Sequence, residues 1–223
     1  MAKKKRITKE EKDNIIKLNS RILRFNLKKE EIIGLDLGTT ITGLYNNKFG
    51  SALWSSTSSN IYERINIIRK EFLLYLSFKK SKKCFFIIED YAFAGQSVIQ
   101  IAELGGIIKT TLYDLHMPFV AIAPTTLKKM VLGPSKQQKI GNKKQQIMVE
   151  VLSRWGVKFE DDNACDAFCL VKFAEYLRAY LNDEKIKEYK TVARDEKISE
   201  RNILNWEKEM FKNFILNRNV ICR

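Results

Sequence analysis

The sequence predicts an α/β fold in which a mixed five-stranded sheet is flanked by helices. Short apolar runs of strand length alternate with longer segments whose apolar residues recur at helical spacing. The first three strand-like segments follow one another without a helix between them, as in a meander, and the turn-rich stretch 46–50 separates the second from the third. Helix, strand, helix, strand and helices then follow, an order typical of an α/β protein. The expected strands are residues 32–37, 42–45, 51–54, 84–88 and 119–122.

Helices are expected where apolar residues return every three or four positions. Ile61, Ile65, Ile68 and Phe72 show this spacing within residues 60–78. A small-residue step, Gly105-Gly106, interrupts a second apolar segment of helical length. The other expected helices are residues 95–115, a short helix capped by Pro124-Thr125-Thr126, 143–154, and a final amphipathic helix at 164–181.

Composition divides the chain into three parts. Residues 1–30 are rich in Lys and Arg and are predicted to form a basic amphipathic helical arm, which either contacts DNA or covers a surface groove. Residues 31–181 form the main domain. Residues 182–223 are charged and are expected to form a helical C-terminal extension.

The charge balance favours a polyanionic partner. Lys and Arg number 40 against 26 Asp and Glu, giving a formal net charge of +14. Such an excess points first to nucleic acid and second to an anionic membrane surface. No apolar run has the length of a membrane span, and no signal-peptide apolar region follows the basic N-terminus. The four cysteines form no CxxC pair and are interpreted as reduced, mostly buried thiols, so we expect a cytosolic protein.

Acidic residues follow two of the apolar strands and begin the last helix. Asp36 lies near the end of the first strand, and Glu89 directly follows the fourth. A carboxylate among apolar residues is costly unless it is paired, protonated or bound to a cation. If these strands are parallel neighbours, both carboxylates lie at the sheet edge where open α/β sheets bind ligands. Asp162 and Asp166, four residues apart at a helix start, would present their side chains to one side.

Carboxylates that converge at one edge repel each other, and hard divalent cations resolve this repulsion. Mg²⁺ prefers carboxylate and water oxygens, and two such ions can together promote phosphodiester hydrolysis. Each acid also has a structural interpretation, as a turn cap, a lysine partner or a helix N-cap. The joint pattern favours a metal site formed by Asp36, Glu89, Asp162 and Asp166.

At these residues the sequence resembles the RuvC-like Holliday junction resolvase family of the ribonuclease-H-like superfamily. Residues 33–43 (IGLDLGTTITG) look like the first-strand motif of the family. Ile88-Glu89, with Ala92-Phe93 and the later Gly105-Gly106, looks like its second motif, and residues 162–167 (DNACDA) look like its closing helix motif. The similarity covers about residues 31–180 and is nearest to phage and viral members.

The resemblance implies a ribonuclease-H-like fold and Mg²⁺-dependent, homodimeric cutting of four-way DNA junctions by paired symmetric nicks. It implies two Mg²⁺ per active site, with Mn²⁺ able to substitute, and no nucleotide cofactor. Many bacterial members place a ligand three residues before the last Asp, where this chain has Asn163; Asp162 is therefore the expected fourth ligand and Asn163 the alternative. Dimer contacts are expected on the helix after Glu89, which carries Val98, Ile101, Ala102, Leu104 and Ile108.

A basic segment and two aromatic residues are expected to contact DNA. Residues 128–144 contain six lysines and no acid, so they can bind phosphates with strongly salt-dependent affinity; the alternative is a solvated lysine face. By the resemblance, Lys136 and Lys143 assist catalysis near the scissile phosphate. Tyr91 and Phe93 either stack on unpaired bases or pack in the core. The expected DNA-binding residues are Lys128, Lys129, Lys136, Lys139, Lys143, Lys144, Tyr91 and Phe93.

Other functions compete with junction resolution. The Asp36–Thr40 run also resembles the first phosphate loop of actin-like and Hsp70-like ATPases. Those proteins need a duplicated domain and a second glycine-rich loop, and the sequence shows neither. Within the nuclease class, a broad-specificity nuclease acting on flaps, Y-branches or replication forks is the main alternative. A ribosomal-RNA-processing nuclease of the same fold and a catalytically silent DNA-binding module come after it. The resemblance places the activity in a bacterial or phage-infected cytoplasm, with a nucleus or viral factory as alternatives.

Overall fold

The computed structural model describes most of the chain in six stretches. These are residues 7–27, 31–79, 83–90, 98–136, 143–192 and 195–217; side chains at 135, 136, 143, 190–192, 195 and 196 lie outside the description. The elements are α1 (Lys9–Leu27), β1 (Glu31–Asp36), β2 (Ile41–Asn46), β3 (Gly50–Ser55), α2 (Ile61–Phe78), β4 (Cys84–Glu89), α3 (Val98–Asp114), β5 (Phe119–Ile122), α4 (Pro124–Lys136), α5 (Lys143–Trp155), α6 (Asp162–Asn182), β6 (Ile186–Val192), β7 (Asp195–Arg201) and α7 (Asn205–Asn217).

The main sheet confirms the predicted mixed five-stranded arrangement. Its strand order is β3-β2-β1-β4-β5, with an antiparallel meander on one side and parallel strands on the other. The parallel pairing of β1 with β4 aligns Leu35 with Ile88, so both strands end at the same edge of the sheet. The two predicted carboxylate-bearing strands are therefore neighbours, as the sequence predicted.

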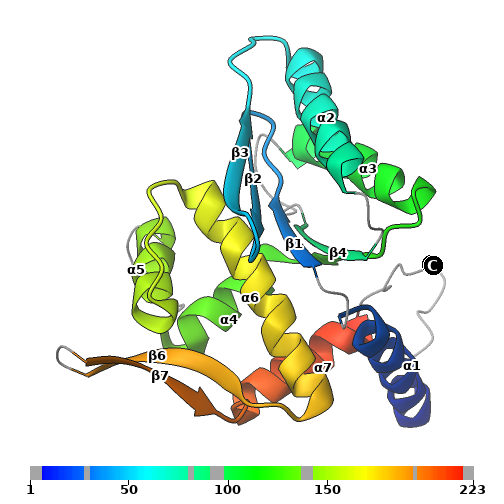
Figure 1. Ribbon diagram of the computed structural model, residues 1–223. Helices are drawn as coiled ribbons and strands as arrows, with labels where there is room; N and C mark the ends of the chain where they lie inside the picture. Colours follow the sequence, from blue (N-terminus) through cyan, green and yellow to red (C-terminus); the bar gives the residue numbers. More distant parts are fainter. Residues whose placement is uncertain are drawn as a thin grey trace.

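Helices cover both faces of this sheet (Figure 1). In that view α2 and α3 lie above it, while α6, α4 and α5 lie below together with α1 and α7. Alternate residues of the central strands supply two separate hydrophobic cores, as a doubly covered sheet requires. In β4, for example, Phe85 and Ile87 face the core shared with α6, whereas Phe86 and Ile88 face the core shared with α2 and α3.

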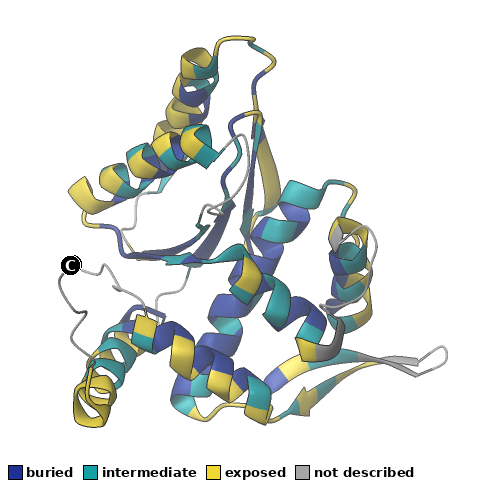
Figure 2. Cartoon of the chain, turned by 180° about the vertical axis from the view of Figure 1, so that it is seen from behind, coloured by how far each residue is buried: buried dark blue, intermediate teal, exposed yellow. Residues whose placement is uncertain are grey.

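The long helix α6 lies directly against β1 and β2. A Cβ atom built on Gly34 would lie 2.1 Å from the carbonyl oxygen of Ala167, and one on Gly43 would lie 2.2 Å from that of Asn163. Only glycine permits this contact between backbones. The helix predicted at 164–181 is present, but the prediction that it is amphipathic was wrong. α6 is buried on nearly all sides (Figure 2), because the sheet, α5, α1 and α7 surround it.

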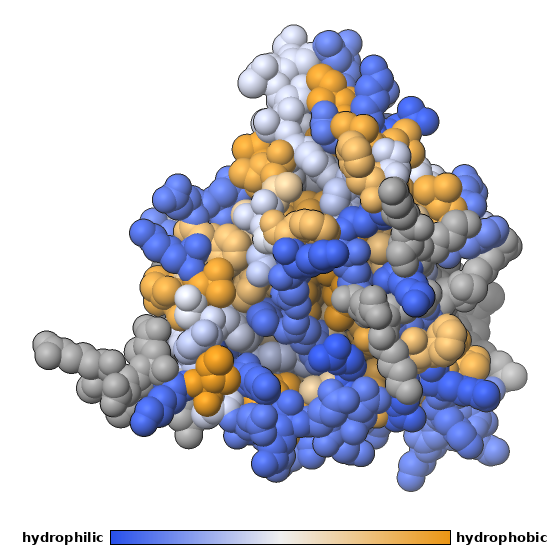
Figure 3. Space-filling model, viewed as in Figure 1, coloured by the Kyte–Doolittle hydropathy of each residue, from blue (hydrophilic) through white to orange (hydrophobic). Residues whose placement is uncertain are grey.

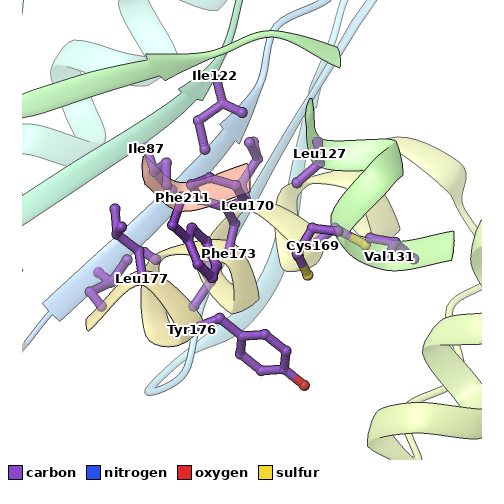
Figure 4. Packing of buried hydrophobic residues seen from close by; sticks show 14 of the residues in the cluster. Ile87, Ile122, Leu127, Val131, Cys169, Leu170, Phe173, Tyr176, Leu177 and Phe211 are labelled. Atoms are coloured by element: carbon purple, nitrogen blue, oxygen red, sulfur yellow. The ribbon is translucent and has the colours of Figure 1, made fainter. Parts of the chain in front are cut away.

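The segment after Asn182 begins with a β-hairpin, which corrects the prediction of a helical extension at residues 186–201. β6 and β7 pair in register from Ile186–Arg201 to Val192–Asp195, and only the later α7 is helical. Phe211 of α7 packs among Phe173, Leu177 and other α6 side chains and enters the same core (Figure 4). The extension is therefore packed into the molecule.

A buried ionic network fastens the hairpin to the helices. Glu188 of β6 accepts hydrogen bonds from Arg154 of α5 and Arg201 of β7, and Arg201 also donates to the fully buried Glu207 of α7. Burial raises the pKa of Glu188, but the hydrogen bonds from Arg201 and the charge of Arg154 outweigh this and lower it to about 2. Glu188 is thus ionised and paired at neutral pH.

The described part of the predicted N-terminal arm contains the helix α1, which packs on the body of the protein. Leu23 and Leu27 of α1 are fully buried in the core shared with α6 and α7. Arg24 donates to the carbonyl oxygen of Leu181, and the side chain of Asn19 donates to that of Ile215. These contacts fix α1 against α6 and α7, and DNA contact by the arm stays a prediction.

Candidate metal centre

Three carboxylates from three separate elements meet at the carboxyl edge of the sheet. Asp36 ends β1, Glu89 ends β4, and Asp166 lies in the second turn of α6. One oxygen from each lies within 4.8 Å of the others. The parallel pairing of β1 and β4 brings the first two together, and the contacts of α6 at Gly34 and Gly43 bring the third. Sequence reasoning had named all three.

Burial and neighbouring negative charge raise the pKa of two carboxyl groups of this cluster. Burial, the negative charge of Glu89 and a hydrogen bond with Glu89 raise the pKa of Asp36 well above its ordinary value. Burial and then the charge of Glu89 raise the pKa of Asp166 to about 7, although Lys128 and Lys144 act in the opposite direction. A nearby divalent cation would favour the ionised form of each group.

The start of α6 fixes the orientation of the acidic motif. Asp161 is the N-cap, and its carboxylate accepts hydrogen bonds from the backbone N–H groups of Asn163 and Ala164 at 2.9 and 3.0 Å. Asp162 forms an ion pair with Lys144 of α5. It lies outside the three-carboxylate cluster, but its charge contributes to the raised pKa of Asp166. The Asn163 side chain donates to Asp161 and Asp162 at 3.3 and 3.5 Å.

Two lysines of the predicted basic segment lie near the carboxylates. Lys128 in α4 and Lys144 in α5 both lower the pKa of Asp166 by their positive charge. Lys129 is half-buried on α4. Lys136 ends α4 and Lys143 begins α5, where only their backbone is described. Lys139, Tyr91 and Phe93 lie outside the described residues, so their predicted DNA contacts stay predictions.

Helix α4 contains a bend at Gly133. Gly133 has a φ of 73°, in the left-handed region, and Pro134 follows it. Arg154 of α5 holds the helical turn before the bend, because its guanidinium donates to the carbonyl oxygens of Met130 and Val131. The sequence did not reveal this role of Arg154, since its partners are backbone atoms of a separate helix.

The donor set fits a hard divalent cation. Three carboxylates supply only oxygen ligands and are partly buried, and burial together with their mutual repulsion raises the pKa of two of them. The described part of the chain contains no other cluster of this kind. His and Cys ligands are absent from the cluster, which disfavours a structural zinc site.

Comparison with known proteins identifies the fold. RuvC of Thermus thermophilus, in a complex described as RuvC with a Holliday junction substrate, aligns with a TM-score of 0.50 and 17% sequence identity. This chain has the RuvC-type fold. A second structure of the same RuvC aligns with a TM-score of 0.50 and 18% identity. No family model matches the sequence, and no curated protein matches it.

The alignment with RuvC differs in extent between the two proteins. It covers 94–95% of the RuvC chains but 66% of this chain, so about a third of this protein has no counterpart in the match. No helix in the described stretches combines the length and apolar character that crossing a membrane requires. At this level of identity the likeness establishes the fold.

Proposed function

We propose that this protein is a Mg²⁺-dependent, structure-selective DNA endonuclease that resolves Holliday junctions by paired symmetric nicks. The observation that carries the proposal is the cluster of Asp36, Glu89 and Asp166 at the carboxyl edge of a RuvC-type sheet. The net charge of +14 supports a nucleic-acid substrate. A solved RuvC complex with a Holliday junction substrate supports branched DNA as the preferred form.

In this proposal Asp36, Glu89 and Asp166 hold two Mg²⁺ ions, for which Mn²⁺ substitutes, and Asp162 is the fourth ligand. The bound ions supply neutralisation of the phosphate charge and an acidified water for in-line attack. Asp36 and Glu89, joined by a hydrogen bond, carry ligand oxygens that the two parallel strands hold in place. The N-cap at Asp161 keeps Asp162 and Asp166 at the start of α6.

The flanking lysines bind phosphate oxygens in this proposal. Lys128 and Lys144 lie near the carboxylates, so their charges attract a DNA strand toward a site that would otherwise repel it. Lys144 is paired with Asp162 and is more than half exposed, so it is accessible to a phosphate. Lys136, Lys139 and Lys143 extend the same basic segment, with the first and last proposed near the scissile phosphate.

We further propose a homodimer, because symmetric nicking requires two equivalent sites. Leu104 and Ile108 of α3 are buried within one chain, whereas Val98, Ile101 and Ala102 are partly exposed and Ile99 is 73% exposed. Apolar side chains also gather on the surface over the upper half of the molecule, around α2 and α3 (Figure 3). These helices offer the surface for a second copy, and we expect the protein to act in the cytoplasm.

One cleavage experiment tests the proposal. Purified protein is incubated with Mg²⁺ and labelled four-way, Y-shaped, flap and linear DNA, beside the variant Asp36→Asn, and light scattering gives the oligomeric state. We expect symmetric nicks in the four-way junction, loss of at least about a hundredfold in the variant, and retained junction binding. Equal cutting of flaps and forks would favour the broad-specificity alternative. Undiminished cutting by Asp36→Asn would overturn the site.

A further inference from the structure

A polar hollow lies between α4 and α7. Its volume is about 320 Å³, and none of its described lining residues is acidic. Two apolar side chains of α7, Met210 and Phe214, contribute to its wall. The polar lining consists of Thr125, Thr126 and Lys129 from α4 and Asn213 and Asn217 from α7.

The polar side chains of this hollow have unused hydrogen-bonding capacity. Within the described stretches, the hydroxyls of Thr125 and Thr126, the ammonium of Lys129 and the amide of Asn217 have no hydrogen-bond or ion-pair partner. Asn213 donates one hydrogen to Glu209 at 3.1 Å, which leaves its second N–H hydrogen available. One unpaired cation among neutral donors, with no carboxylate in the lining, is a donor set that suits a phosphate oxygen.

The hollow is close in the fold to the carboxylate cluster. Ile122, the last residue of β5, is the register partner of Glu89, and α4 begins two residues later at Pro124. Thr125 and Thr126, in the first turn of α4, therefore lie next to the edge of the sheet that carries Glu89. Successive residues of a helix point about 100° apart, so α4 presents Lys128 toward Asp166 and Lys129 toward the hollow.

We propose that this hollow binds a backbone phosphate of the strand being cut, a few nucleotides from the scissile one, through Lys129, Thr126 and Asn217. The inference rests on the proposed function and deepens it, because it identifies where the substrate is held outside the metal centre. A phosphate fixed there sets the register of the strand across Asp36, Glu89 and Asp166. Because α7 supplies part of the lining, the C-terminal extension takes part in binding the substrate.

The first test measures the salt dependence of junction binding. Fluorescence anisotropy with a labelled four-way junction in EDTA compares the wild type, Lys129→Ala and Lys212→Ala; Lys212 is exposed on α7 outside the hollow. We expect Lys129→Ala to weaken binding about tenfold and to reduce the slope of log affinity against log salt by about 0.9. The matched control should keep the slope of the wild type, and circular dichroism should show both variants folded.

The second test locates the phosphate. Single neutral methylphosphonate linkages are placed in turn at each of the phosphates flanking the cut. We expect one position at which the wild type loses affinity and Lys129→Ala does not, since the variant has already lost that contact. This inference is overturned if Lys129→Ala keeps the wild-type slope of log affinity against log salt. It is also overturned if both proteins are equally sensitive to a methylphosphonate at every position. Neither outcome would affect the proposal of metal-dependent cleavage. Failure of the wild type to bind or cut branched DNA overturns the proposed function itself.

Discussion

Replacing Asp166 by Asn should stabilise the metal-free protein at alkaline pH. Asp166 lies partly buried beside Glu89 and Asp36, and its pKa is raised from 3.8 to about 7. The folded protein therefore keeps this proton over a pH range in which the unfolded chain has lost it. Asn is neutral at every pH and occupies nearly the same volume, so the variant removes the charge and preserves the packing.

The pKa gives the size of the effect and its direction. Below about pH 4 the aspartate is protonated in both states, so the stability that depends on it is fully present. As the pH rises to about 7, the free energy of unfolding of the wild type falls by up to about 4 kcal/mol, because one pKa unit corresponds to about 1.36 kcal/mol. We expect the free energy of unfolding of Asp166→Asn to exceed that of the wild type by about 2–4 kcal/mol at pH 8 and by much less at pH 4.

Urea denaturation in EDTA at pH 4, 6 and 8 measures this difference. Glu71→Gln, on an exposed position of α2, removes one negative charge far from the cluster and should show no such pH-dependent gain. Mg²⁺ should raise the melting temperature of the wild type more than that of Asp166→Asn, because binding to the folded state alone stabilises it. A gain of equal size at all three pH values would refute the electrostatic reasoning.

Two further substitutions test how α6 supplies the site. Asp162→Asn should reduce cleavage more than Asn163→Ala, because only the former removes a charged ligand; the opposite ranking in a single-turnover cleavage assay would assign the ligand position to Asn163. Gly43→Ala should lower the free energy of unfolding by about 1–3 kcal/mol, since the added Cβ would lie 2.2 Å from the Asn163 carbonyl oxygen. The same change should weaken Mg²⁺ binding measured by calorimetry. Gly106→Ala, with open space around its Cβ, is the matched control, and comparable losses in both variants would contradict this view of α6.

The fold of residues 31–181 could be predicted because its apolar runs are strong local signals. The strand Cys84–Glu89 is apolar on both faces and ends at a carboxylate, and all five strands of the main sheet were predicted to within about two residues. The hairpin β6–β7 could not be predicted in this way. Ala193 and Arg194 stand between its strands instead of the Asn-Gly or Asp-Gly that signals a tight turn. Its charged residues are accommodated by Arg154, which is distant in sequence, and by Glu207 of the helix that follows.

The candidate site was predictable only in part for the same reason. Acids that end apolar strands are conspicuous in a sequence, so Asp36 and Glu89 were found together with Asp166. The contacts that set Asp162 apart from Asp166 are tertiary and cannot be read from the local sequence. The ion pair between Lys144 and Asp162 joins two helices, and no local pattern encodes it. Likewise Asn213 and Asn217 are unremarkable residues of α7 until the fold brings them to α4.

The position of α6 connects stability with the proposed chemistry. Carboxylates whose oxygens lie within 4.8 Å of one another repel when they are ionised, so another interaction must hold Asp166 against the sheet. Backbone contact at Gly34 and Gly43 does this, and the buried side chains on either side of α6, including Phe168 and Phe173, supply the apolar burial. The helices α1 and α7 enclose the far half of α6. The terminal elements therefore support the candidate metal centre, because they anchor the helix that carries its third carboxylate.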